Sequence, residues 1–145
     1  MIRIYHALPV AALALAACTD SAPSGQWTMQ SSATAGSALV LTQNGSEALR
    51  IACRRNPADL LVTTPRLAGR RGPARLEIGD TAFKLRSAGD EPVLSATGPL
   101  TAALPLAMAS GRAISVHQAG AATAAFPPPE RKIAEAFASA CVLPG

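Results

Sequence analysis

Apolar side chains alternate with polar ones along much of this chain, which is the pattern of half-buried β-strands. Strands are predicted at residues 26–29, 38–43, 48–53, 59–64, 74–78, 81–86, 93–97, 113–117 and 121–126. Turn-forming pairs, such as Asn44-Gly45 and Gly79-Asp80, separate neighbouring segments. Because short turns of this kind join antiparallel strands, the pattern predicts an antiparallel sheet of about six to eight short strands.

The turn around Asn44-Gly45 permits two hairpin registers. A two-residue loop would place Leu39 opposite Arg50, whereas a three-residue loop pairs Leu39 with Ile51 and Leu41 with Leu49. A slip of one residue moves every side chain to the other face of a strand. The three-residue loop is therefore preferred, because it keeps one face apolar.

The turn at Gly79-Asp80 gives the clearest hairpin. It places Leu76 opposite Phe83 on one face and Arg75 opposite Lys84 on the other. An apolar face backed by a charged face is typical of an antiparallel strand pair with one side in the core.

Two segments have helical spacing. After Pro129, the apolar positions that share one helix face are Ile133, Ala136, Phe137, Ala140 and Cys141. Residues 100–110 have similar spacing, and Pro105 within them predicts a kink or a break. The expected fold is α+β: a single small domain over residues 26–145, with the C-terminal helix and a second, broken helix packed on one face of the sheet.

The N-terminal residues have a different organisation. Arg3 supplies one positive charge, and residues 7–14 form an apolar run shorter than the roughly 20 residues that span a bilayer. The next residues, Leu15-Ala16-Ala17-Cys18, resemble the lipobox of bacterial lipoproteins. The resemblance implies cleavage before Cys18, diacylglycerol on its sulfur and acylation of the new amine. The alternative is a plain secretory signal whose cleavage site precedes a cysteine.

The lipobox resemblance implies a signal peptide at 1–17, followed by a lipidated cysteine and a flexible tether at 18–25. The seven tether residues after Cys18 are small and polar and reach at most ~25 Å. Thr19 occupies the position where, in the enterobacterial sorting rule, an Asp retains a lipoprotein in the inner membrane. The protein is therefore expected to face the periplasm on a lipid anchor, with the outer membrane favoured over the inner.

Three cysteines are present, and lipidation of Cys18 leaves Cys53 and Cys141. In an oxidising envelope an isolated pair of cysteines indicates a disulfide. This bond would tie the C-terminal helix to an early strand.

Composition excludes several function classes. The chain has 13 basic and 9 acidic residues, a formal charge of +4, but 11 of the basic residues are Arg and the chain is rich in Ala, as GC-rich coding alone can produce. One Trp, one Tyr and three Phe leave few rings for base stacking, and no nucleic-acid-binding motif is present. A nucleic-acid partner is therefore not expected.

Candidate catalytic and metal-binding groups are scarce. His117 is the single histidine after residue 17, and alternation with Ile114 and Val116 places it on the solvent face, with no acidic residue near it in sequence. The sequence contains no nucleophile elbow, phosphate-binding loop or metal-ligand spacing. No catalytic residue, metal or cofactor is predicted, and the chain is not expected to be an enzyme.

One constellation stands out: a segment of 21 residues with six cations and two acids, Glu77 and Asp80. The cations are Arg66, Arg70, Arg71, Arg75, Lys84 and Arg86. Near a membrane such a cluster binds anionic groups at roughly 1 kcal/mol per cation. The bland alternative is charge that protects an edge strand from aggregation.

The pattern over residues 26–141 also resembles small, uncharacterised exported proteins of alphaproteobacteria. The residues that carry this resemblance are Gly25-Gln26-Trp27, a strand ending at Cys53, Ser110-Gly111-Arg112 after a short helix, and a helix ending at Cys141. The resemblance implies an architecture and no activity. The expected role is a non-catalytic binding or structural domain in the envelope. The alternatives are a small hydrolase and a carrier of an apolar ligand held by Leu104, Met108 and Phe137.

Overall fold

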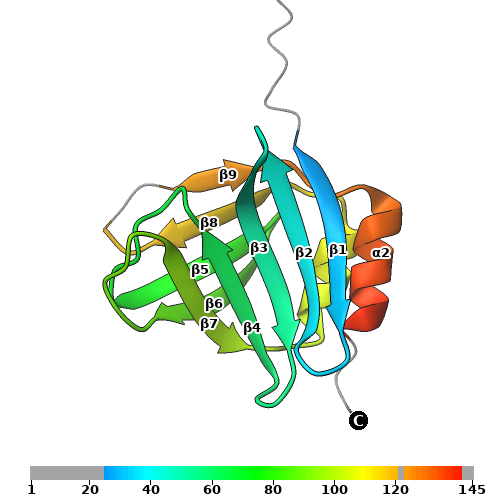
Figure 1. Ribbon diagram of the computed structural model, residues 1–145, viewed down its shortest axis with the longest axis horizontal. Coiled ribbons are helices and arrows are strands. Elements are labelled where there is room, and N and C mark those ends of the chain that lie inside the picture. The colour runs from blue at the N-terminus through cyan, green and yellow to red at the C-terminus, as the bar shows by residue number, and fades with distance from the viewer. Residues whose placement is uncertain (1–24, 121–122, 142–145) are drawn as a thin grey trace, which may run out of the picture.

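The computed structural model describes residues 25–120 and 123–141 (Figure 1). The strands in these residues are β1 (Gln26–Ser32), β2 (Gly36–Gln43), β3 (Ser46–Arg54), β4 (Asp59–Thr64), β5 (Gly72–Ile78), β6 (Thr81–Ser87), β7 (Leu94–Pro99), β8 (Ile114–Gln118) and β9 (Ala124–Phe126). The helices are α1 (Ala103–Ala109) and α2 (Arg131–Ala140). The expected signal peptide at 1–17, Cys18 and all of the tether except Gly25 lie outside the described residues.

The strands form one antiparallel sheet in the order β1-β2-β3-β4-β7-β6-β5-β8-β9. The sheet curls into a half-barrel, in which β5, β6, β8 and β9 run across the direction of β1–β4 (Figure 1). β7 lies next to β4 and continues the first group, so the two groups meet where β6 pairs with β7. A Cβ atom at Gly98 of β7 would lie 2.2 Å from the carbonyl oxygen of Lys84, so this close crossing of the strands requires glycine.

Both predicted sets of cross-strand pairs are confirmed, but the loop of the first hairpin is the two-residue Asn44-Gly45, because Gln43 pairs with Ser46 and a bulge between Leu41 and Thr42 restores the predicted register. β2 and β3 pair Leu41 with Leu49 and Leu39 with Ile51. β5 and β6 pair Leu76 with Phe83 on the inner face and Arg75 with Lys84 on the outer face. Local alternation therefore determines which side of each hairpin enters the core.

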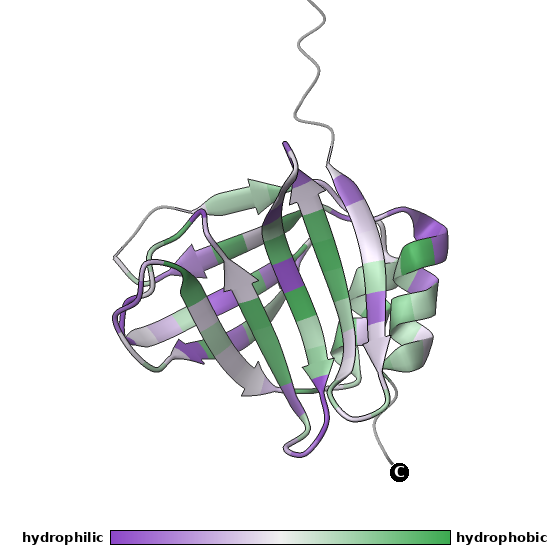
Figure 2. Ribbon diagram, viewed as in Figure 1, coloured by the Kyte–Doolittle hydropathy of each residue, from purple (hydrophilic) through white to green (hydrophobic). Residues whose placement is uncertain are grey.

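The inward side chains of the strands and helices form one main core, visible as hydrophobic stripes along β2–β4 in Figure 2. Leu39, Leu49 and Ile51 from the sheet are fully buried, as are Leu104 and Phe137 from the helices. Burying a side chain of this size contributes roughly 1.5–3 kcal/mol. The two helices pack against each other, and α2 also contacts β1 and β2.

Two long-range links fasten the segment that contains α2. The Trp27 indole nitrogen donates a hydrogen bond to the carbonyl oxygen of Pro127, 3.1 Å away, just ahead of the helix. At the other end, Cys141 forms the predicted disulfide with Cys53 of β3, with a Cα–Cα distance of 5.7 Å. The helix is therefore attached to the sheet near both of its ends.

Three expectations about the fold were wrong. The sheet has nine strands rather than six to eight, because all nine strand-like segments of the sequence, including the end strands β1 and β9, join the same sheet. Residues 100–110 do not form a broken helix: α1 is one short helix, and Pro105 lies in its first turn, where a backbone N–H has no helical acceptor. On α2 the buried line runs through Ala134, Phe137 and Cys141, so Ala136 is exposed.

Candidate functional site

The outer face of β5, β6 and β8 carries the largest group of polar side chains predicted from the sequence. Strand pairing places His117, Arg75 and Lys84 in one row across β8, β5 and β6. Arg86 lies two residues further along β6, on the same face as Lys84. The structure therefore brings three of the six predicted cations onto one surface.

Arg70 and Arg71 directly precede β5. Because Gly72 pairs with Ser87, these two arginines lie at the same end of the hairpin as Arg86. We define the basic face as Arg70, Arg71, Arg75, Lys84 and Arg86, all of which are exposed.

Carboxylates neutralise the basic face only in part. Arg75 donates to Glu77 at 2.7 Å, and the backbone N–H of Arg71 donates to Asp90. Among the described residues, no carboxylate forms an ion pair with the side chains of Arg70, Arg71, Lys84 or Arg86. Four of the five side chains are thus available to an anionic partner.

Arg66, the sixth predicted cation, has a different environment. Its guanidinium donates to the carbonyl oxygen of Ala125 at 3.0 Å and to the side-chain oxygen of Gln43, and it lies 4.8 Å from the centre of the Phe126 ring. These contacts link the loop after β4 to β2 and β9. Arg66 therefore braces the half-barrel and does not belong to the basic face.

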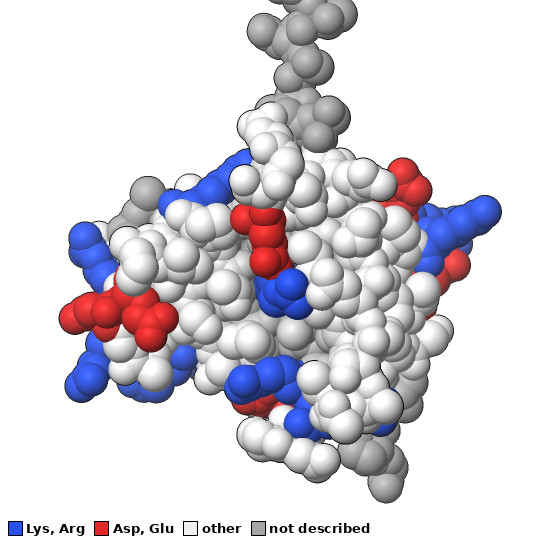
Figure 3. Space-filling view, in the orientation of Figure 1, with Lys and Arg blue, Asp and Glu red and all other residues white. Residues whose placement is uncertain are grey.

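The opposite half of the sheet offers no comparable surface. Figure 3 shows few charged side chains over β1–β4, whereas blue and red groups gather at the left edge, where one end of the β5–β6 hairpin lies. On β3, Arg50 pairs with Glu47, and Arg54 makes a two-pronged contact with Asp59. The hydrogen bonds to Asp59 raise the pKa of Arg54 despite partial burial. These cations are already matched by acids.

His117 lies on the outer face, as predicted, but it has an acidic partner that the sequence did not reveal. Its Nε2 lies 2.9 Å from Oε2 of Glu77 and 3.0 Å from the Ser115 hydroxyl, and its Nδ1 lies 2.8 Å from the Thr123 hydroxyl. A carboxylate only accepts, so neutral His117 donates from Nε2 and accepts from Thr123 at Nδ1.

This chain of groups could move a proton between Thr123 and His117. Acyl transfer would also need a substrate recess and donors for an oxyanion. None of these side chains lines the cleft beside α1, the recess at the β1–β2 turn or the recess between the end of α1 and the start of α2. Among residues 25–120 and 123–141 there is also no group of three His, Cys, Asp or Glu side chains that could hold a metal ion.

The environment of Glu77 shifts its ionisation. Desolvation favours the neutral acid, but the positive charge that His117 carries when protonated, together with the hydrogen bond and charge of Arg75, outweighs it and lowers the pKa of Glu77. Glu77 therefore stays ionised in moderately acidic solution and holds His117 and Arg75 in place.

This shift predicts how stability depends on pH. As the pH falls below 4.5, the ordinary pKa of a glutamate, Glu77 takes up a proton in the unfolded chain before it does so in the folded chain. Stability therefore falls as the pH drops through the lowered pKa that Glu77 has in the folded chain. Between neutral and acidic pH, the free energy of unfolding measured in urea should fall less in Glu77→Gln than in the wild type. Glu135→Gln on α2 is the matched control and should keep the wild-type loss. Equal acid losses in Glu77→Gln and the wild type would contradict the shift.

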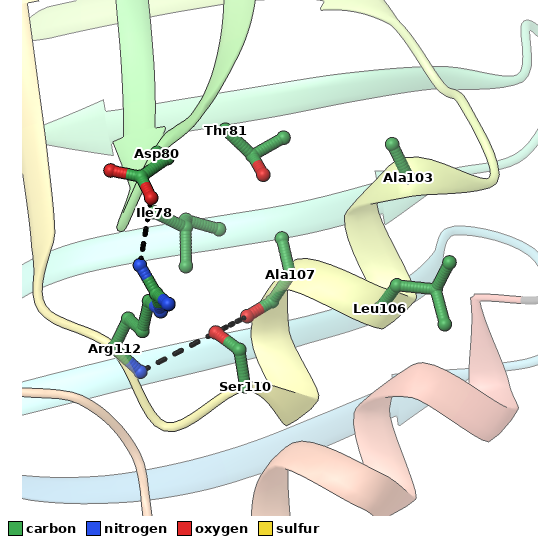
Figure 4. Close-up of a pocket in the computed structure, with 8 residues that line it drawn as sticks. All are labelled: Ile78, Asp80, Thr81, Ala103, Leu106, Ala107, Ser110 and Arg112. Atoms are coloured by element: carbon green, nitrogen blue, oxygen red, sulfur yellow. Dashed lines mark hydrogen bonds and ion pairs between the residues drawn. The ribbon is translucent and has the colours of Figure 1, made fainter.

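A cleft beside α1 is the second surface feature that stands out, and the sequence analysis missed it. Its volume is about 360 Å³, and its lining comes from α1, the β5–β6 turn and the segment after the helix (Figure 4). The lining residues are Ile78, Asp80, Thr81, Ala103, Leu106, Ala107, Ser110 and Arg112. A signal was present in the sequence, because residues 92–111 contain no charged side chain.

Local geometry fixes the rim of this cleft. Gly79 has φ +58°, and a Cβ atom there would lie 2.2 Å from the Arg112 side chain, so glycine lets Arg112 lie across the turn. Arg112 Nη1 then donates to Asp80 Oδ2 at 2.9 Å. At the end of α1, the Ser110 hydroxyl donates to the carbonyl oxygen of Ala107 at 2.5 Å (Figure 4). The rim thus holds one cation and one anion side by side.

The residues suggested for an apolar carrier site lie in the core. Leu104 and Phe137 are fully buried, and Met108 is 1% exposed. All three pack within the main hydrophobic cluster.

Comparisons with known proteins add no relative to this description: no family model, no curated protein and no solved structure matches the chain. In the described residues, no helix has both the length and the apolar character needed to cross a membrane.

Proposed function

We propose that this protein is a lipid-anchored component of the bacterial cell envelope, which faces the periplasm and binds an anionic envelope component through the basic face. The role is one of binding or support rather than catalysis. The lipobox-like Leu15-Ala16-Ala17-Cys18 supports the anchor, and Thr19 after it favours the outer membrane.

The observation that carries the binding role is the clustering of five exposed cations on and beside one hairpin. Lys84 and Arg86 project from the outer face of β6, Arg75 lies opposite Lys84 on β5, and Arg70-Arg71 flank the same hairpin end. Phosphate groups of lipid headgroups or of lipopolysaccharide have the matching charge. A tether of at most ~25 Å would keep the domain within reach of such groups.

Binding should be visible with the unlipidated chain, residues 19–145, which contains the whole described fold. We expect it to co-sediment with vesicles that contain an anionic phospholipid and not with neutral vesicles. Changing Arg70, Arg71 and Arg75 together to Ser should weaken binding roughly a hundredfold, because each cation contributes about 1 kcal/mol to binding. Binding should also fall as the screening length shrinks from about 10 Å at 0.1 M salt to about 3 Å at 1 M.

A variant with the same loss of charge elsewhere is the control. Arg55, Arg131 and Lys132 are exposed and lie outside the basic face, so their triple change to Ser should have a much smaller effect. The proposal fails if anionic vesicles are not bound, if binding ignores salt, or if both triple variants lose binding equally.

A further inference from the structure

An apolar recess and an exposed leucine lie together on the surface beside α1. Leu106 is 77% exposed, and it is the one exposed large hydrophobic side chain among residues 25–120 and 123–141. Beside it the cleft has apolar walls formed by Ile78, Ala103 and Ala107 (Figure 4). A protruding leucine and an apolar recess therefore share one small surface.

The same surface carries matched charges. Asp80 and Arg112 form an ion pair at the rim, yet their side chains remain 95% and 59% exposed. Each charge is thus open to a partner on another molecule. No other charged residue lies between Glu91 and Arg112 in the sequence, so α1 itself is entirely uncharged.

We propose that the chain forms a two-fold dimer through this surface, in which Leu106 of each copy occupies the cleft of the other. A two-fold interface brings a surface against itself, so each feature must find its complement on that same surface. Here the protrusion matches the recess, and Asp80 of one copy faces Arg112 of the other. An anionic membrane fits less well, because Arg112 is already paired with Asp80 and the rim carries no net positive charge.

The dimer is compatible with the proposed binding role but does not depend on it. The cleft lies at the Gly79-Asp80 turn, whereas Arg70, Arg71 and Arg86 lie at the opposite end of the β5–β6 hairpin. Dimerisation through α1 would therefore leave both basic faces open. Two linked faces would bind a charged surface more tightly than one.

Sedimentation velocity of residues 19–145 over a wide concentration range tests the dimer. The wild type should shift from monomer to dimer as its concentration rises. Leu106→Asp should raise the dissociation constant about 30-fold or more, the size expected for a central interface side chain. Because Leu106 is exposed, its replacement should leave thermal unfolding unchanged. Ala58→Asp, on the exposed turn between β3 and β4, adds the same charge away from the cleft and should dimerise like the wild type.

A charge-reversal experiment tests the arrangement across the two-fold axis. Asp80→Arg places two cations at the rim and Arg112→Asp places two anions there, so each variant alone should dimerise poorly. Mixed together they should form a heterodimer, because each cation then meets an anion of the other chain. A wild type that stays monomeric, a dimer indifferent to Leu106→Asp, or a mixture of the reversed variants that does not associate would each overturn the proposal.

Discussion

Removal of the Cys53–Cys141 disulfide is expected to lower the free energy of unfolding by about 2–5 kcal/mol. The two cysteines are 88 residues apart, so the bond restricts most of the unfolded chain. In the folded chain both side chains are buried, at 4% and 3% exposure, and the bond holds the end of α2 against β3. Urea unfolding of the oxidised wild type and of a Cys53→Ala, Cys141→Ala double variant measures the difference.

The double variant separates the loss of the bond from the effect of a reductant. Adding dithiothreitol should destabilise the wild type and leave the double variant unchanged. Alkylation of the mature protein without reductant should modify neither cysteine. Free thiols in protein purified from the envelope, or equal stability of the two chains, would contradict this prediction.

Replacement of Cys18 by Ser is expected to abolish lipid attachment. The sulfur of Cys18 is the atom to which the lipobox resemblance assigns the diacylglycerol, and a serine hydroxyl does not replace it. Cells fed labelled palmitate should incorporate it into the wild type and not into Cys18→Ser. In a high-salt wash, which screens attachment through the basic face, the variant should also leave the membrane fraction.

Thr19→Asp is the matched control for this experiment. It changes the neighbouring residue and keeps the acylated cysteine, so labelling should persist. By the enterobacterial sorting rule its product should move from the outer to the inner membrane. Palmitate in Cys18→Ser would exclude the lipoprotein assignment.

Sequence reasoning succeeded where the structure depends on neighbours in the chain. The pairings of Leu41 with Leu49 and of Leu76 with Phe83 follow from alternation, although the first hairpin reaches its register through a bulge and not through the predicted loop. The Cys53–Cys141 bond was also predictable, because few cysteines were available.

The contacts between side chains on the outer face were harder to predict from the sequence. β5 pairs with β8, although β6, β7 and α1 lie between them in the sequence. Which strands become neighbours depends on how the whole sheet curls. The Glu77–His117 pair, 40 residues apart, was missed for that reason. Alternation had placed both residues on outer faces, but it did not indicate which strands would lie side by side. Arg66 was grouped with the other cations because its contacts, Gln43 and Phe126, also lie far from it in the sequence.

The link between Trp27 and Pro127 determines how tension on the proposed N-terminal lipid anchor would enter the domain. Tension arriving at Gly25 meets Trp27 as the second residue of β1, whose ring is 5% exposed and whose nitrogen is bonded to Pro127. From there the force divides between the β1–β2 ladder and α2, and the helix passes its share to β3 through Cys141. The edge strand is therefore not the single element that would resist extraction, because β2, β3 and α2 share the load.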